Sequence, residues 1–288
     1  MALTLTDRES VTIEKGYVSI EDGRVHYLKA GAGPPLILLH GLVGSAHNWR
    51  QNIHVLAQQF CVYAFDLPNM GDSDRIKGSD ASLETASDRI AACMEILGLD
   101  RADVSGHSHG GAIAMMLAVR HPERVGRLVL YAPANPYCNL GYGLISFYQT
   151  PLGVWFARQI PWLPRAIKRV ALRRMYGDPT RMRADALDGY VRGLAIPGTI
   201  DHVLGILRGW TAGMERLRLQ LEQIAEKPVL LIWGDCDRTV GLSSARLLRR
   251  VLKQSRLVVL PGVGHIPFEE MPEECNRTMA SWLMELSA

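Results

Sequence analysis

The sequence predicts a doubly wound α/β fold with a mostly parallel sheet and an inserted helical cap. Short apolar runs bounded by glycine are typical of strands that are buried on both faces, as in parallel sheets. These runs alternate with amphipathic patterns of helical period along most of the chain. One long stretch, residues 134–214, interrupts the alternation and contains no convincing strand.

The first half of the chain begins with strands. Residues 17–29 are predicted as a β-hairpin that turns at Asp22 and Gly23. Residues 35–40 (PLILLH) form a continuous apolar run, and residues 61–66 repeat that pattern. A helix is predicted from about Ser82 because apolar residues fall on one of its faces. Those residues are Leu83, Ala86, Ile90, Cys93, Met94 and Leu97.

The second half continues the alternation. A strand near residues 102–107 precedes a helix that ends at Arg120, because His121 and Pro122 follow. The last helix is expected to begin near Pro272, since proline suits the first helical position. Its inner face is predicted to carry Cys275, Met279, Trp282, Leu283 and Leu286. Three further strands are predicted at residues 128–131, 229–233 and 257–260.

Composition excludes several classes of protein. The 288 residues are 48% hydrophobic and 21% charged, which is ordinary for a globular chain and unlike a disordered one. A net charge of +3 does not favour nucleic acid as a partner. Five cysteines, none spaced as C-x-x-C, indicate reduced thiols and a cytoplasmic location. No secretory signal is evident at the N-terminus, and the longest apolar runs have strand length.

The interrupting stretch divides the chain into two parts. Residues 1–133 and 215–288 are predicted to form the core, and residues 134–214 a helical cap over one end of the sheet. The cap holds half of the aromatic residues and carries ten Lys and Arg against four Asp. Its basic residues are interpreted as a solvated helical face rather than an anion site. The apolar residues Leu163, Ile167, Val170 and Ala171 are predicted to share the opposite face.

The sharpest local motif surrounds Ser108. The residues Gly106-His107-Ser108-His109-Gly110 lie between a predicted strand and a predicted helix. A nucleophile elbow needs this context, because the turn is too tight for side chains at the flanking glycines Gly106 and Gly110. A glycine-rich turn with a bystander serine is the alternative interpretation.

A nucleophilic serine needs a base and an acid that orients the base. His265 follows the last predicted strand, and Asp237 follows the strand before it. Both therefore lie at the carboxyl ends of strands, where Ser108 is also presented. Asp235 is the alternative acid, because it stands only two residues from Asp237.

The same end of the sheet offers donors for an oxyanion. We expect the backbone N–H groups of His109, which opens a helix, and of Leu42 to serve as these donors. Leu42 lies in the loop that starts at His40 and Gly41. His40 is expected to brace this loop by hydrogen bonding. No metal site is predicted, because no H-x-x-x-H pair with a nearby acid is present on one helix.

Five ordered motifs together resemble the α/β-hydrolase superfamily. They are His40-Gly41, residues 66–73 (DLPNMGDS), the Ser108 elbow, Trp233-Gly234-x-x-Asp237 and Gly264-His265. The resemblance covers about residues 17–133 and 215–288, and residues 134–214 correspond to the variable cap. Asn69 departs from the family pattern, because many relatives carry glycine there. The resemblance implies a Ser-His-Asp triad of Ser108, His265 and Asp237, and no cofactor.

These residues predict a serine hydrolase that cleaves carboxylic esters through an acyl-enzyme. The aromatic cap suggests an apolar small-molecule ester. A carbon–carbon bond hydrolase or a perhydrolase of the same fold remains an alternative, as does a triad-bearing lyase or a non-enzymatic ligand receptor. Among partners, a homo-oligomer remains open, whereas a membrane is not favoured because no long amphipathic, Lys-rich helix with exposed Trp is clearly defined.

Overall fold

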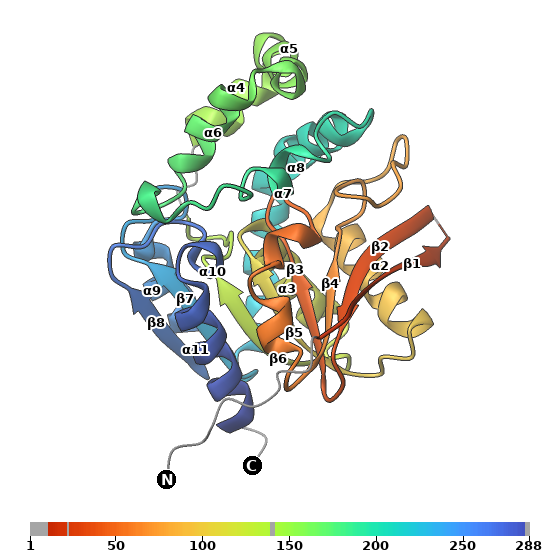
Figure 1. Cartoon of the computed structure of the whole chain (residues 1–288), viewed down its shortest axis with the longest axis vertical. Helices are drawn as coiled ribbons and strands as arrows, with labels where there is room; N and C mark the ends of the chain where they lie inside the picture. Colours follow the sequence, from red (N-terminus) through yellow and green to blue (C-terminus); the bar gives the residue numbers. More distant parts are fainter. Residues whose placement is uncertain (1–10, 22, 139–141, 286–288) are drawn as a thin grey trace.

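A single mixed sheet forms the centre of the molecule. The computed structural model describes residues 11–21, 23–138 and 142–285, so the predicted turn residue Asp22 and the predicted helix residue Leu286 lie outside the described residues. Within them, eight strands pair in the order β1-β2-β4-β3-β5-β6-β7-β8 (Figure 1). The strands are β1 (Ile13–Ile20), β2 (Gly23–Ala30), β3 (Pro35–Leu39), β4 (Cys61–Phe65), β5 (Ala102–His107), β6 (Val125–Tyr131), β7 (Val229–Gly234) and β8 (Ser255–Leu260).

The pairing confirms the predicted mostly parallel sheet. Strand β2 pairs antiparallel with both β1 and β4, and every other neighbouring pair is parallel. The hairpin begins at Ile13 rather than at residue 17, because residues 13–15 pair with residues 28–30 through their backbones. Backbone pairing needs no alternation of apolar side chains, so the sequence pattern did not reveal this extension.

Helices cover both faces of the sheet. The core helices are α1 (Ile53–Leu56), α2 (Leu83–Ile96), α3 (His109–Arg120), α9 (Leu242–Val251), α10 (Pro267–Glu270) and α11 (Pro272–Glu285), with the 3-10 turns η1 (Ala46–Trp49) and η4 (Leu221–Ile224). Along β3, Ile37 and Leu39 share a buried cluster with α2 and α3. The alternate residues Leu36 and Leu38 share another cluster with α1, α10 and α11. The sheet therefore separates two apolar layers, as a doubly wound fold requires.

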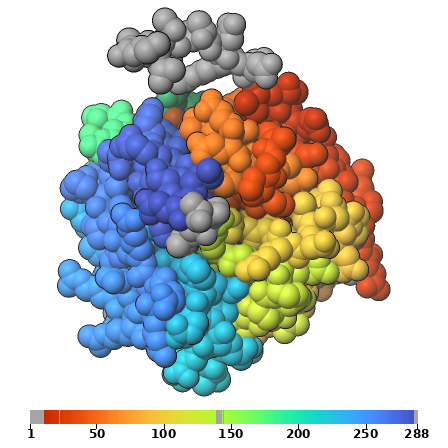
Figure 2. Space-filling model, turned by 90° about the horizontal axis from the view of Figure 1, so that it is seen from below, coloured from red at the N-terminus to blue at the C-terminus, as the bar shows by residue number. Residues whose placement is uncertain are grey.

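The cap is helical and covers one end of the sheet. It contains α4 (Tyr142–Gln149), α5 (Pro151–Gln159), η2 (Ile160–Trp162), α6 (Arg165–Arg173), η3 (Pro179–Arg181), α7 (Asp188–Val191) and α8 (Thr199–Gln220). Helices α4, α5 and α6 form the tip of the molecule in Figure 1. Figure 2 views the opposite end, where little of the green cap segment is in sight. Helix α8 runs through the predicted boundary at residues 214 and 215 and returns the chain to the core.

The predicted apolar face of the cap is only partly correct. Leu163 is extended and lies before α6, because the residue that precedes a proline, here Pro164, avoids helical geometry. Ile167 and Val170 do share one face of α6, and both are exposed. No helix among residues 11–21, 23–138 and 142–285 is long and apolar enough to cross a membrane.

Candidate active site

The turn between β5 and α3 presents Ser108 in a strained conformation. Its φ is 49°, in the left-handed region that a residue with a side chain rarely adopts. A Cβ atom at Gly106 would lie 2.4 Å from the carbonyl oxygen of Gly110. At Gly110 it would lie 2.3 Å from the carbonyl oxygen of His40. Both glycines are therefore required by close backbone contacts, as the elbow motif predicts.

Ser108, His265 and Asp237 form one hydrogen-bonded series. His265 Nε2 lies 3.0 Å from Ser108 Oγ, and His265 Nδ1 lies 2.8 Å from Asp237 Oδ2. With its proton on Nδ1, the imidazole donates to Asp237, and its Nε2 lone pair accepts from the hydroxyl of Ser108. The three side chains follow β5, β7 and β8, so the parallel sheet brings them to one edge.

The structure separates the two candidate acids. The second oxygen of Asp237 accepts the backbone N–H groups of Thr239 at 2.7 Å and Val240 at 2.9 Å, which fixes the carboxylate toward His265. Asp235 instead accepts the N–H of Gly262 at 2.7 Å. Asp235 therefore closes a turn between two loops, and Asp237 is the acid that contacts the imidazole.

Two backbone N–H groups remain available beside the hydroxyl of Ser108. Within the described part of the chain, the N–H groups of Leu42 and His109 donate to no other protein group. Both residues line the same cavity as Ser108. His109 begins α3, so the positive end of that helix adds to the local field. These two donors could hold an oxyanion.

His40 braces the loop that carries Leu42. Its Nε2 accepts the N–H of Leu67 at 2.9 Å, and its Nδ1 donates to the carbonyl oxygen of Gly41 at 2.8 Å. Burial lowers the pKa of His40, so the imidazole stays neutral and can make both bonds. A Cβ atom at Gly41 would lie 2.7 Å from His107 Nδ1, which explains the glycine at this position.

His107 contributes a contact that the sequence analysis missed. Its Nε2 donates to the backbone carbonyl of His265 at 2.9 Å, and its ring packs edge-on against Phe268. Burial lowers the pKa of His107 well below its ordinary value, so the ring is neutral. His107 thus positions the loop of the candidate base. No local signal could reveal this role, because His265 is 158 residues away in the chain.

Backbone groups of the cap also contact the loop of His265. The N–H of His265 donates to the carbonyl oxygen of Met175 at 2.7 Å. The carboxylate of Glu270 accepts three N–H groups, from Gly264 at 2.8 Å, Gly177 at 3.0 Å and Asp178 at 2.8 Å. Glu270 therefore joins the cap to the residue that precedes the candidate base. The sequence analysis singled out neither Glu270 nor Met175.

A cavity of about 480 Å³ lies between the candidate triad and the cap. Ser108 and His265 reach its wall from the core. Its other walls are mainly apolar and include Ile145, Ala157, Ile160, Leu204 and Trp210 from the cap. Arg238 carries the one permanent charge among the described lining residues. The arrangement suits an apolar ligand whose reactive group meets Ser108.

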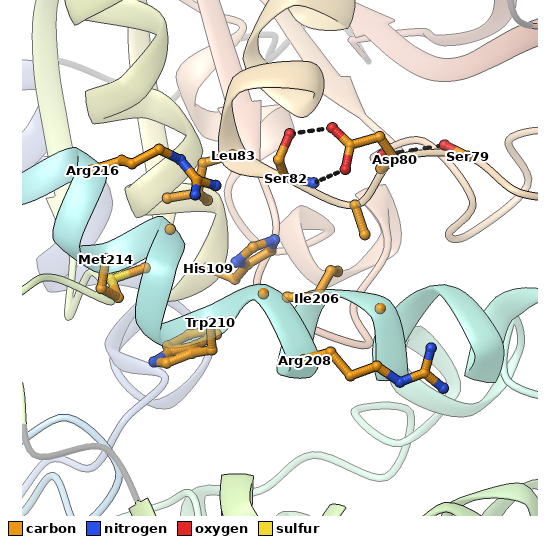
Figure 3. Close-up of a pocket in the computed structure, with 14 residues that line it drawn as sticks. Ser79, Asp80, Ser82, Leu83, His109, Ile206, Arg208, Trp210, Met214 and Arg216 are labelled. Carbon is orange, nitrogen blue, oxygen red and sulfur yellow. Dashed lines mark hydrogen bonds between the residues drawn. The ribbon is translucent and has the colours of Figure 1, made fainter. Parts of the chain in front are cut away.

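A second cavity of about 330 Å³ lies on the other side of α8. Figure 3 shows His109 between α8 and residues 79–83, and Trp210 on the side of α8 away from those residues; both side chains line this cavity. The same two side chains line the first cavity, and their ring centroids are 6.0 Å apart. Together they form a wall between the two cavities. Burial lowers the pKa of His109 to about 3, so its side chain is neutral.

One cluster in the described residues has side chains that could ligate a metal. It consists of His26, Asp66 and Asp72, whose ligand atoms lie within 4.8 Å of one another. The oxygens of Asp66 already accept hydrogen bonds from His26 Nδ1 at 2.7 Å and from the N–H groups of Ala46 at 2.6 Å and Asp72 at 2.8 Å. These donors indicate a carboxylate that organises loops rather than one that binds a cation.

Comparisons with known proteins agree with the fold described above. A family model described as alpha/beta hydrolase fold matches residues 34–272. A pimeloyl-[acyl-carrier protein] methyl ester esterase from Nitrosomonas europaea is 29% identical over 87% of this chain and 96% of its own length. The dihydrolipoyllysine-residue acetyltransferase component of the acetoin cleaving system from Pseudomonas putida is also 29% identical, over 87% of this chain. The match spans only 64% of that relative.

Among solved structures, a 2-hydroxy-6-oxo-6-phenylhexa-2,4-dienoate hydrolase from Rhodococcus sp. strain RHA1 has a TM-score of 0.79 to this chain. It is 25% identical, and the alignment covers 96% of this chain and 98% of that one. The similarity to this structure extends over the cap as well as the core, since almost the whole of both chains is aligned.

Proposed function

The chain belongs to the α/β-hydrolase fold family, and on that premise we propose that it cleaves carboxylic esters with Ser108 as the nucleophile. The observation that carries this proposal is the series Ser108–His265–Asp237 at the wall of an apolar cavity. A serine next to a histidine that is oriented by a carboxylate can transfer its proton as it attacks an acyl carbon.

In the first half of the reaction, Ser108 Oγ bonds to the acyl carbon and His265 Nε2 takes the hydroxyl proton. The carbonyl oxygen becomes an oxyanion, which the N–H groups of Leu42 and His109 stabilise. Asp237 stabilises the imidazolium that forms. The tetrahedral species then collapses, the ester C–O bond breaks, and His265 gives its proton to the leaving alcohol.

The second half repeats these steps with water. Water adds to the acyl carbon of the acyl-enzyme while His265 accepts a water proton. Collapse breaks the bond to Ser108 Oγ, which recovers the proton from His265, and the carboxylic acid leaves. Every proton that moves in this scheme passes through His265 Nε2, so no cofactor is needed.

The cavity walls support an apolar acyl or alcohol group as the substrate. The cap side chains that line the cavity are mainly aliphatic or aromatic, and contact with them removes apolar surface from water. Arg238 would favour a substrate that also carries an anionic group near the mouth.

A carbon–carbon bond hydrolase is the second candidate. The Rhodococcus structure supports it, because that protein acts on a dienoate and aligns with 96% of this chain. Relatives of that class usually carry Trp directly after the histidine, whereas this chain has Ile266. Epoxide hydrolases resemble the chain in fold but use an aspartate nucleophile, and position 108 is a serine.

The test is a series of p-nitrophenyl esters from acetate to decanoate, assayed with the wild type and with Ser108→Ala. We expect ester turnover by the wild type and a loss of at least about 10³-fold in kcat for Ser108→Ala. A fluorophosphonate probe should label Ser108 covalently in the wild type. Inactivity of the wild type on every ester, or undiminished turnover by Ser108→Ala, would reject the proposal.

The two neighbouring aspartates supply a matched pair of variants. Asp237→Asn should reduce kcat by about 10⁴-fold, because the amide no longer holds the tautomer that accepts the proton of Ser108. Asp235→Asn should retain kcat within about twofold, since that carboxylate accepts the N–H of Gly262 in a turn, whereas Asp237 contacts the imidazole. The reverse result would assign the acid role to Asp235.

A further inference from the structure

The tip of the cap exposes apolar side chains on helix α5. Leu152 is 65% exposed and Trp155 is 60% exposed, and Phe156 is also on the surface. Their spacing of three and four residues places them on one face of the helix. The opposite face carries Ala157, which lines the cavity above Ser108. Helix α5 therefore has an apolar face toward the cavity and another toward solvent.

The next elements continue this exposed surface. Trp162 in η2 is 75% exposed. In α6, Ile167 is 52% exposed and Val170 is 57% exposed, whereas Leu172 on another face is buried. An amphipathic helix normally packs its apolar face on the core, and α6 turns this face outward. We call residues 151–173 the tip segment.

All charged residues in the tip segment and in the adjoining stretches of the chain are basic. Residues 142–177 contain six Lys and Arg and no Asp or Glu. Two of these arginines pair at the surface with acids from beyond this range, Arg158 with Asp201 and Arg165 with Asp188. The other four basic residues are Lys168, Arg169, Arg173 and Arg174. The exposed apolar side chains are thus flanked by positive charge.

We propose that the tip segment docks on an anionic lipid surface, with α5 and α6 lying in the plane of the interface. Amphipathic helices of this kind bury aromatic and aliphatic residues among the headgroups, while Lys and Arg contact anionic lipids. Exposed Trp suits this position, because its ring is apolar and its N–H remains in contact with water. The expectation that disfavoured a membrane rested on the absence of a long amphipathic, Lys-rich helix with exposed Trp. Here two short helices, α5 and α6, together present the exposed apolar and basic side chains.

A second copy of the chain is a less suitable occupant. A two-fold symmetric interface would bring the same basic segment of each copy together. The like charges would then repel each other at the point where the apolar side chains meet. An anionic surface is attracted by the same charges, so charge complementarity selects the lipid.

Docking would place the cavity close to the source of an apolar substrate. Ala157 and Ile160, which line the cavity, lie between the exposed Trp155 and Trp162 in the chain. A lipid-soluble ester could then reach Ser108 with a short path through water. This consequence rests on the proposed esterase function, but the docking itself does not.

The experiment is sedimentation with vesicles of phosphatidylcholine, with and without 30 mol% phosphatidylglycerol. The wild type should bind the anionic vesicles at low salt and be released by 0.5 M NaCl, because salt screens the basic residues. Trp155→Ser/Trp162→Ser should reduce binding by at least 10-fold. Arg173→Gln/Arg174→Gln should reduce it by up to about 30-fold.

Controls separate docking from folding and from catalysis. Ile96→Ser/Met284→Ser, which changes exposed apolar residues outside the cap, should bind as the wild type does. Ser108→Ala should also bind fully, so failure of the esterase proposal and failure of docking are distinguishable. Each tip variant should still hydrolyse water-soluble p-nitrophenyl acetate if the wild type does, and should keep the wild-type circular dichroism spectrum.

Two results would overturn the proposal. The first is equal binding of the wild type and the Trp155→Ser/Trp162→Ser variant to anionic vesicles, or no binding by either. The second is a concentration-dependent dimer in sedimentation equilibrium that the same double variant dissociates, which would assign the surface to a second copy.

Discussion

At the residue scale, Ser108 has a costly backbone conformation that its surroundings maintain. A left-handed residue other than glycine costs about 1–3 kcal/mol. The N–H of Ser108 donates to the carbonyl of Tyr131 at 3.0 Å, and its own carbonyl accepts the N–H of Ala134 at 2.8 Å. Both partners come from β6 and the loop after it, so the sheet holds the turn and directs the hydroxyl toward His265.

The buried His109 is predicted to make the free energy of unfolding sensitive to acid. Burial lowers its pKa to about 3, whereas the unfolded imidazole titrates near 6.5. Because the unfolded chain binds this proton first, the contribution of His109 is fully present above about pH 6.5 and is lost as the pH falls toward 3. Lowering the pH from 7 to 5 reduces the free energy of unfolding. This reduction should be about 2 kcal/mol smaller for His109→Gln than for the wild type.

Urea denaturation at both pH values measures this difference. His54→Gln, at an exposed histidine of α1, is the matched control and should follow the wild type. If the free energy of unfolding of His109→Gln and of the wild type fell equally between pH 7 and pH 5, the assignment of this term to His109 would be wrong.

At the element scale, α8 shapes the cavity beside Ser108. Its residues Val203, Leu204 and Leu207 face the cavity above Ser108. Gly205, Gly209 and Gly213 border the second cavity, where larger side chains would take up space. Glycine inside a helix costs roughly 1 kcal/mol relative to alanine. The space of the second cavity is therefore obtained at the expense of the stability of α8.

Trp210 is the residue of α8 that keeps the two cavities apart. Trp210→Ala should join them and shift the ester preference toward longer acyl chains, because each buried methylene contributes about 0.8 kcal/mol. We expect the ratio of kcat/KM for decanoate to that for butyrate to rise about 10-fold, with a stability loss of about 3–5 kcal/mol. Trp210→Phe retains an aromatic wall and should keep the wild-type ratio. An unchanged ratio in Trp210→Ala would show that substrates do not approach this wall.

The sequence predicts local features better than contacts between distant segments. The elbow glycines and the helix after Ser108 follow from short-range sterics, so their pattern is visible in a few residues. The outward direction of the apolar face of α6 is not, because an amphipathic pattern is the same whether the face packs inward or meets solvent. The contact of His107 with His265 likewise depends on how far-separated strands meet, which no local pattern reports.

At the scale of the whole molecule, two buried carboxylates hold the cap on the core. Glu269 accepts the hydroxyl of Tyr190 in the cap at 2.8 Å and the amide of Asn48 in the core at 3.1 Å. Glu270 accepts N–H groups from both the cap segment at Gly177 and the loop at Gly264. The side chain of Glu270 therefore links the position of the cap to the position of the loop that carries His265.

Glu270→Gln tests this coupling. The amide nitrogen cannot accept the N–H groups that the carboxylate accepts, so about 1–3 kcal/mol of stability should be lost. We expect kcat for p-nitrophenyl butyrate to fall about 10-fold as His265 becomes less precisely placed. The control is Glu273→Gln on the exposed side of α11, which should leave both quantities unchanged. If Glu270→Gln lost stability but kept the wild-type kcat, Glu270 would have a purely structural role.

The position of the triad in the sheet has a consequence for biosynthesis. Ser108 follows β5 in the middle of the sheet, whereas His265 follows β8 at its edge, 157 residues later in the chain. A ribosome therefore releases the nucleophile long before the base, and a nascent chain that ends before β8 carries an inert serine. On the proposed mechanism, catalytic competence would arise only once β8 and the loop of His265 have docked on the sheet.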